Sequence, residues 1–142
     1  MTVYKTILCA IDFSDDNHRL IEAALALTSA EHVHLAHVCE HPITGYGELT
    51  GRNHQTTEHQ IRQSVYPKLV TLAESYGMTA RQTHIEFGRP ADVIETVVVT
   101  IGVNLVVIGS HGHSGLRALL GSTANSIIHS SSCNVLTVRS NQ

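Results

Sequence analysis

The stretch LVVIGSHGHSGLRALLGST, residues 105–123, joins a buried strand to a glycine-rich loop and to helical sequence. Leu105–Ile108 is a short apolar run rich in β-branched residues, which is typical of a strand buried on both faces. Three glycines within Gly109–Gly115 let the backbone approach a ligand closely and present its N–H groups. Leu116–Leu120 is predicted as a helical turn and Ser122–Ser131 as a second helical piece. The stretch therefore predicts a binding loop at the carboxyl end of a strand.

The alternation of buried strands with amphipathic helices continues over the rest of the chain. Strands are predicted at Val3–Ile11, His32–Val38, Thr79–Glu86, Leu105–Ile108 and Val135–Val138. Further helices are predicted at residues 16–30, 54–76 and 91–101, with Pro67 interrupting the second of them. Residues 40–53, which contain several glycines, are expected to form a long loop. This order predicts an α/β fold, an open doubly wound five-stranded parallel sheet with helices on both faces, in a single domain over residues 1–142.

Composition excludes several classes of protein. Of the 142 residues, 42% are hydrophobic and 15% charged, which is typical of one globular domain. Nine Lys and Arg against twelve Asp and Glu supply no basic face, so we expect no nucleic-acid partner. No apolar run is long enough to span a bilayer and no signal peptide is visible, so we expect no membrane insertion. Three cysteines without a CxxC pair predict reduced thiols in a cytoplasmic protein.

Histidine is frequent, with eleven residues spread along the chain. The densest group is His32, His34, His37 and His41. In a strand, His32 and His34 share one face while His37 lies on the other, which is poor geometry for a single metal ion. We therefore expect scattered histidines and no structural metal site.

Three polar features follow the carboxyl ends of predicted strands, where open parallel sheets bind ligands. Asp12, followed by Phe13 and Ser14, can accept hydrogen bonds from a ribose hydroxyl or an amine; alternatively it only caps the next helix. The loop Gly109–Gly115 is the second feature. The third is Gly121–Thr123 at the predicted start of the last helix, where free N–H groups bind phosphate. The last two together predict a split phosphate cradle; the alternative is a flexible turn and an ordinary helix cap.

Motifs of other nucleotide-binding and catalytic classes are missing. The chain has no GxxxxGK[ST] motif, no GxGxxG after the first strand and no GxSxG elbow. His111 and His113 lie beside the predicted cradle. A catalytic base needs an orienting partner, and the sequence shows none for either histidine. Contact with phosphate or exposure to solvent is the preferred interpretation of both.

With these residues the chain resembles the universal stress protein family over nearly its whole length. The resemblance rests on Ile7–Ser14, His37-Val38, Gly88–Ala91, Val107–Gly112 with Leu119–Thr123, and Cys133–Val138. It implies a fold of the adenine-nucleotide α-hydrolase-like type and a homodimer joined through Val135, Leu136, Thr137 and Val138. Nucleotide-binding members carry Gly-x-x-Gly, nine residues, then Gly-Ser/Thr. Here only eight residues separate Gly112 from Gly121.

The resemblance also implies ATP or AMP as the ligand and assigns residues to its parts. Asp12 would contact the ribose or adenine, with Ser14 in the same turn, and backbone groups of Ala10 and Val38 would line the edge of the base. The phosphates, with a divalent ion such as Mg²⁺ bridging them, would be held by Gly109, His111, Gly112, Gly121, Ser122 and Thr123.

Three functions are weighed on this basis. The first is a dimeric stress-response module that binds adenine nucleotide and regulates an unidentified protein partner. The second is a dimeric interaction module of the same fold with an empty or different site, which the shortened glycine spacing favours. The third is a slow ATP hydrolase, which would need His111 or His113 to position water. The apolar last strand favours pairing at a sheet edge; the alternative is that residues 139–142 cover it.

Overall fold

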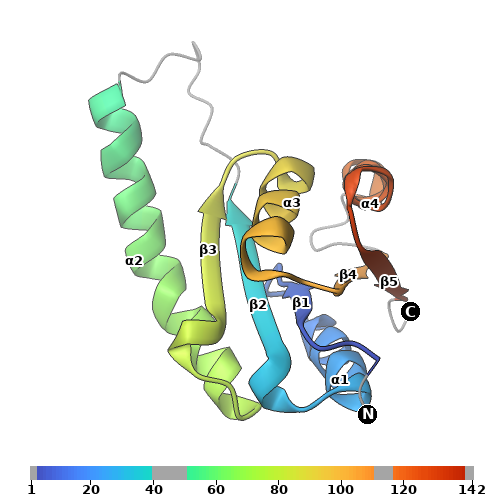
Figure 1. Cartoon of the computed structure of the whole chain (residues 1–142). Helices are drawn as coiled ribbons and strands as arrows, with labels where there is room; N and C mark the ends of the chain where they lie inside the picture. The colour runs from blue at the N-terminus through green and yellow to red at the C-terminus, as the bar shows by residue number, and fades with distance from the viewer. Residues whose placement is uncertain (1–2, 40–50, 111–116, 140–142) are drawn as a thin grey trace.

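Five strands form one parallel sheet in the order β3-β2-β1-β4-β5 (Figure 1). They are β1 (Ile7–Ala10), β2 (Val33–Cys39), β3 (Thr83–Phe87), β4 (Leu105–Gly109) and β5 (Asn134–Val138). The computed structural model describes residues 3–39, 51–110 and 117–139, and of residues 51–56 and 117–123 only the backbone. Every neighbouring pair of strands is parallel, which confirms the predicted sheet.

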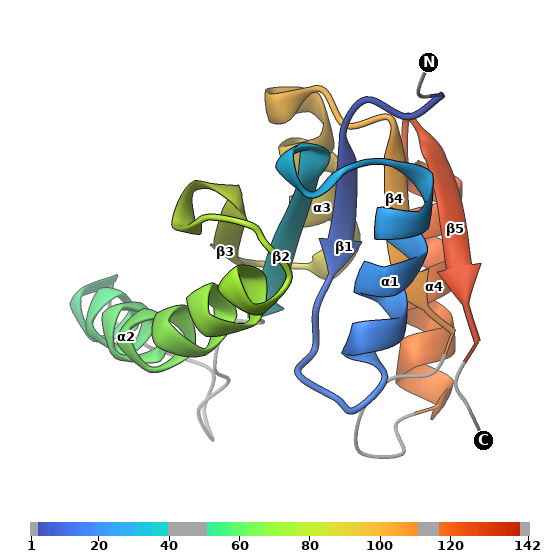
Figure 2. The same cartoon turned by 90° about the horizontal axis from the view of Figure 1, so that it is seen from below.

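Helices cover both faces of this sheet (Figure 2). They are α1 (Asn17–Leu27), α2 (Gly51–Ser75), α3 (Pro90–Ile101) and α4 (Arg117–Ser130). Neighbouring residues of a strand point to opposite faces. Ile7 and Cys9 accordingly pack with α1 and α2, whereas Leu8 packs with α3 and α4. The doubly wound α/β architecture is confirmed.

The first strand is shorter than predicted, because it begins at Ile7 and not at Val3. The backbone N–H groups of Lys5 and Thr6 both donate to the side-chain oxygen of Asn104, at 3.0 Å each. These donors are therefore committed to a side chain in place of a strand ladder. Val3 is 85% exposed, so this apolar residue is not part of a buried strand.

The third strand is also shorter than predicted, since residues 80–82 form a short 3-10 helix, η2 (Ala80–Gln82). Thr79 and Gln82 cap each other at its start. The Gln82 amide also donates to the carbonyls of Ala30 and Val33, at 2.7 and 2.6 Å. Gln82 thereby ties the start of β3 to the start of β2.

The second helix begins at Gly51, inside the segment expected to be a loop, and continues through Pro67. Residues 40–50, the rest of that expected loop, lie outside the described residues. Proline cannot donate to the carbonyl four residues earlier. That carbonyl belongs to Gln63, which is exposed, so water can satisfy it.

The last helix is one continuous element, and the prediction of two helical pieces is wrong. Gly121, Ser122 and Thr123 are its fifth to seventh residues, and the prediction that they start a helix is also wrong. Leu and Ala at positions 118–120 are strong helix formers, and one interior glycine costs only about 1 kcal/mol. The first four backbone N–H groups of a helix have no partner within that helix. In α4 these four N–H groups belong to residues 117–120 and not to Gly121–Thr123.

Candidate ligand site at the carboxyl ends of β1 and β4

The order of the strands reverses next to β1, which lies between β2 and β4. In open α/β sheets, ligands bind in the crevice outside the carboxyl ends of the strands at such a switch point. Ala10, Val38 and Gly109 are half-buried at these ends. Cys9 and Ile108, which precede Ala10 and Gly109, are buried. The topology thus brings the ends of β1, β2 and β4 to one edge, with Asp12 two residues beyond β1.

The turn between β1 and α1, residues 11–17, is organised by Asn17. Its side-chain oxygen accepts the backbone N–H groups of Asp12 at 3.0 Å and of Phe13 at 2.6 Å. Its amide nitrogen donates to Asp12 Oδ1 at 2.8 Å. Asn17 is only 5% exposed, so these bonds are formed away from bulk water. We call residues 11–17 the β1–α1 turn.

Asp12 shapes this turn and does not cap the helix. Its Oδ1 also accepts the backbone N–H of Ser14 at 2.9 Å. The residue at the N-cap position of α1 is Asp16, and it makes no side-chain capping bond. The alternative in which Asp12 caps α1 is therefore wrong. The half-buried carboxylate of Asp12 is held in one orientation near the switch point of the sheet.

His37 ties the end of β2 to the same turn. Its Nδ1 lies 2.7 Å from the carbonyl oxygen of Ile11, so this nitrogen carries the proton and donates. The ring lies 4.7 Å from that of Phe13, at a tilt of 49°. Phe13 has a φ of +62°, a left-handed conformation that costs a non-glycine residue about 1–3 kcal/mol. The packing of its ring offsets part of that cost.

Sequence reasoning missed the roles of Asn17 and His37. In the sequence, His37 is singled out only in the dense histidine group and in the His37-Val38 motif, and Asn17 is not singled out. An asparagine five residues after Asp12, at the first position of a helix, was the available signal. Nothing in the local sequence reports the contact between His37 and Ile11, which lie 26 residues apart.

The predicted phosphate-binding residues are only partly placed. The N–H group of Ser110, next to Gly109, donates to the carbonyl of Val138 at 2.9 Å, which ties the start of the loop to β5. His111 and Gly112 lie outside the described residues. Gly121, Ser122 and Thr123 are placed by their backbone inside α4. The split cradle therefore stays a prediction.

The three cysteines are unpaired in the structure, and two of them are buried. Burial raises the pKa of Cys9 to about 12. Burial also raises the pKa of Cys39, with Arg62 opposing that shift and Glu58 adding to it. A thiol with a raised pKa stays protonated at neutral pH and is a poor nucleophile. Cys9 and Cys39 therefore act as packing residues.

Within the described part of the chain, no group of three or more His, Cys, Asp or Glu residues is arranged to hold a metal ion. In the same residues, no helix is both long and apolar enough to cross a bilayer.

β5 is an edge strand, as predicted, because it ends the strand order and, among the described residues, pairs with β4 alone. Val135, Leu136 and Val138 are half-buried and Thr137 is exposed. Residues 140–142, the alternative cover for this edge, lie outside the described residues. Pairing of the edge with a second chain stays a prediction.

The parallel sheet, its strand order and its helices on both faces define a doubly wound α/β protein, and comparison with known proteins identifies the family. The model of the universal stress protein family matches residues 3–139. Universal stress protein A homolog 1 of Coxiella burnetii is 32% identical over 138 residues, which cover 95% of this chain and 96% of that protein. The chain therefore belongs to the universal stress protein family.

Solved structures share the fold. That of hypothetical protein MJ0577 matches with a TM-score of 0.74 and 24% identity over 99% of both chains. A universal stress protein solved in complex with cAMP matches with a TM-score of 0.62 and 19% identity, over 96% of this chain and 98% of the other. At such identities the likeness is one of fold.

Proposed function

We propose that this chain is a cytoplasmic, homodimeric regulatory module of the stress response that binds an adenine nucleotide, ATP or AMP, in the crevice at the ends of β1 and β4. The observation that carries the proposal is the β1–α1 turn at the switch point of the sheet. There Asp12 is held in place by Asn17 and Ser14, at 2.8 and 2.9 Å. A carboxylate oriented before the ligand arrives is suited to accept a ribose hydroxyl or an adenine amine.

The fold relatives support a nucleotide as the ligand, since one universal stress protein was solved in complex with cAMP. In this chain, half-buried Ala10 and Val38 would offer backbone groups to the base. Gly109, His111, Gly112, Gly121, Ser122 and Thr123 would hold the phosphates. Mg²⁺, when bound with them, would neutralise phosphate charge. Ligand contacts at the turn and the loop would bias a surface read by a protein partner.

A dimeric interaction module without nucleotide is the second candidate, and two observations favour it. Only eight residues separate Gly112 from Gly121. In addition, Gly121 lies inside α4, where its N–H is used within the helix. Slow hydrolysis of ATP is a weaker candidate, because the sequence shows no orienting partner for His111 or His113 as a base.

Calorimetric titration of the nucleotide-stripped protein with ATP and Mg²⁺ separates the candidates. We expect micromolar binding that is lost in Gly112→Asp, which places a negative charge in the loop, and in Gly121→Val. Thr71→Asp adds the same charge on the exposed side of α2 and serves as the control. A folded wild-type protein that binds no nucleotide would overturn the nucleotide proposal and favour the interaction module.

Sedimentation of Val138→Lys tests the dimer. A charge in the edge of β5 should give monomers, because it would be buried without a partner in a paired edge. Val99→Lys, on a side chain that is 68% exposed on α3, should remain dimeric. If Val138→Lys remains dimeric as well, the interface lies elsewhere.

A further inference from the structure

A second candidate site lies at the opposite edge of the sheet from β5. A cavity of about 290 Å³ separates the edge strand β3 from α3. One wall is apolar and consists of Val93, Val97 and Ile101, which are one helical turn apart on α3. Phe87 of β3 also borders the cavity, but its ring packs on the other face of the sheet, 5.3 Å from the guanidinium carbon of Arg62 on α2. None of these residues belongs to the crevice at β1 and β4. We call this space the β3/α3 cavity.

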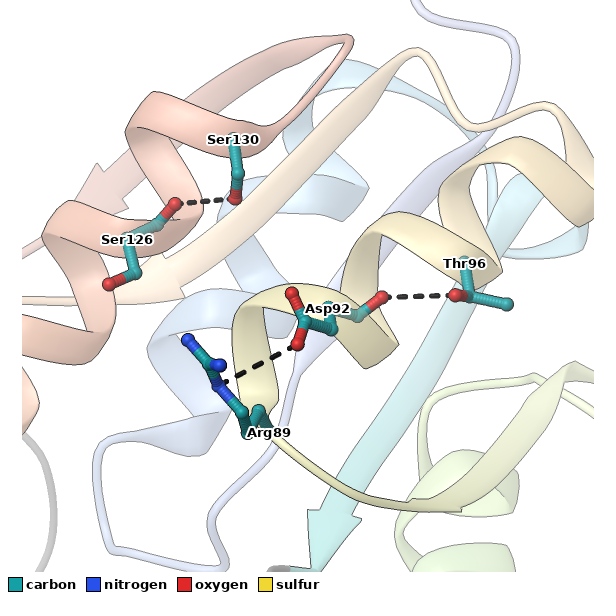
Figure 3. Close-up of polar contacts among 5 residues, drawn as sticks. All are labelled: Arg89, Asp92, Thr96, Ser126 and Ser130. Carbon is teal, nitrogen blue, oxygen red and sulfur yellow. Dashed lines mark hydrogen bonds and ion pairs between the residues drawn. The ribbon is translucent and has the colours of Figure 1, made fainter.

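Polar side chains complete the lining. His84 and Glu86 are two residues apart on β3 and so lie on one face of the strand. Thr96 and Thr100 are exposed and lie one turn apart on α3. The Thr96 hydroxyl donates to the carbonyl of Asp92 at 3.0 Å, within its own helix (Figure 3). Glu86 is the only Asp, Glu, Lys or Arg among the lining residues, so at neutral pH it sets the sign of the cavity.

His84 does not neutralise that charge, because it is paired with a second imidazole. Its Nε2 lies 3.0 Å from Nδ1 of His34 on β2, and the two ring centres are 5.2 Å apart. One nitrogen must donate and the other accept, so the two rings cannot both be protonated in this arrangement. Burial lowers the pKa of His84 below its ordinary value, which favours the neutral ring at pH 7.

The cavity therefore combines one apolar wall, one carboxylate and a neutral imidazole. We propose that the β3/α3 cavity binds a small organic ammonium ion that carries an aromatic ring. The ring packs against the apolar row of α3, Val93, Val97 and Ile101, and the ammonium group donates to the Glu86 carboxylate and the Thr100 hydroxyl.

Size and charge both select this class of ligand. A cavity of about 150 Å³ is sufficient for benzene, so 290 Å³ accommodates a ring with a short ammonium arm. It is at the small end of ligand pockets, which favours a small ligand. An anion of the same size is disfavoured, because the lining offers a negative charge and no lysine or arginine. The proposal does not depend on nucleotide binding.

Titration of the full chain with 2-phenylethylammonium near pH 7.5, followed by calorimetry and ligand-observed NMR, tests the proposal. We expect saturable binding of one ion per chain. Neutral 2-phenylethanol and anionic 3-phenylpropanoate should bind about tenfold or more weakly, because hydrogen bonds to charged groups are stronger than neutral ones. Wild-type protein that shows no saturable binding of the ammonium ion, or no preference over the alcohol, would overturn the proposal.

Two pairs of variants locate the site. Glu86→Gln should weaken binding of the ammonium ion about tenfold and leave the alcohol unchanged, whereas Glu74→Gln on exposed α2 should bind as the wild type does. Thr96→Trp should block the cavity from its exposed rim and abolish ammonium binding without lowering the unfolding midpoint. Val99→Trp on the same helix should leave ammonium binding unchanged.

Gly112→Asp should leave ammonium binding intact, which separates this cavity from the proposed nucleotide site. Unchanged binding in Glu86→Gln and Thr96→Trp would place the ion elsewhere and overturn the assignment.

Discussion

The β1–α1 turn and the β3/α3 cavity use their polar side chains in opposite ways. In the turn, Asp12 and Asn17 bond to each other and to the backbone between them. In the cavity, Glu86 has no hydrogen-bond or ion-pair partner among the residues that the structure describes. A polar group that is bonded to its neighbours fixes the backbone. One that faces an apolar cavity unpaired is available to a ligand.

Removal of Asn17 should have the largest effect of the changes considered. Asn17→Ala leaves the N–H groups of Asp12 and Phe13 without their acceptor, which should lower the free energy of unfolding by about 3 kcal/mol. Urea unfolding measures the loss, and nucleotide affinity should fall with it. Asn134→Ala, which removes an exposed bond to the Tyr4 hydroxyl at 3.1 Å, is the control. Equal losses in both variants would contradict the special role of the turn.

Gly88→Ala should have the next largest effect, and it acts on the wall of the cavity. Gly88 has a φ of +140°, and an added Cβ would lie 2.9 Å from Cγ2 of Val93. We expect a loss of about 2 kcal/mol from backbone strain, together with weaker ammonium binding as Val93 shifts.

Gly102→Ala is the matched control for Gly88→Ala. Gly102 has a φ of +73° and nothing within 4 Å of its added Cβ. Its loss should be about 1 kcal/mol and its ammonium affinity that of the wild type. A cavity that is unaffected in both variants would show that Val93 does not shape the site.

Acidification should destabilise the pair of histidines that borders the cavity. Burial lowers the pKa of His34, with His84 adding to that effect, and burial lowers the pKa of His84. As the pH falls through the ordinary value of 6.5, the unfolded chain binds protons at these rings before the folded chain does. The unfolded state then binds more protons than the folded state, so the free energy of unfolding decreases as the pH decreases.

Urea midpoints between about pH 7.5 and about pH 5.5 measure this slope. His34→Gln should reduce the slope, because it removes one buried imidazole and the charge that acts on His84. His129→Gln, at an exposed position of α4, should leave it unchanged. An identical slope in all three proteins would show that the pair does not set the pH dependence.

The ion pair at the start of α3 should contribute least. Arg89 Nε lies 3.6 Å from Asp92 Oδ2, and the two side chains are 87% and 69% exposed (Figure 3). Solvent screens such a pair, so Arg89→Ala should change the free energy of unfolding by less than about 0.5 kcal/mol. Thermal unfolding at low and high salt checks this. A salt-dependent loss larger than that of Gly102→Ala would mean that the pair holds α3 at the cavity.

Much of the fold was predictable from the sequence because periodicity is a local property. The five apolar runs identified the parallel strands, and Asp12 was correctly expected beyond the end of β1. β5 was correctly expected at an edge. The errors occurred where a side chain or a helix replaced the expected backbone pattern. Asn104 takes the donors before β1, and α4 continues through Gly121.

The sequence by itself determined which segments are strands and helices, and which residues follow the strand ends. Only the tertiary structure decided which of those residues meet. His34 and His84 are 50 residues apart and touch because β2 and β3 pair in register. His37 reaches Ile11 because β1 and β2 are neighbours. Such contacts depend on the order of the strands and on their packing, which cannot be predicted from a short segment of the sequence.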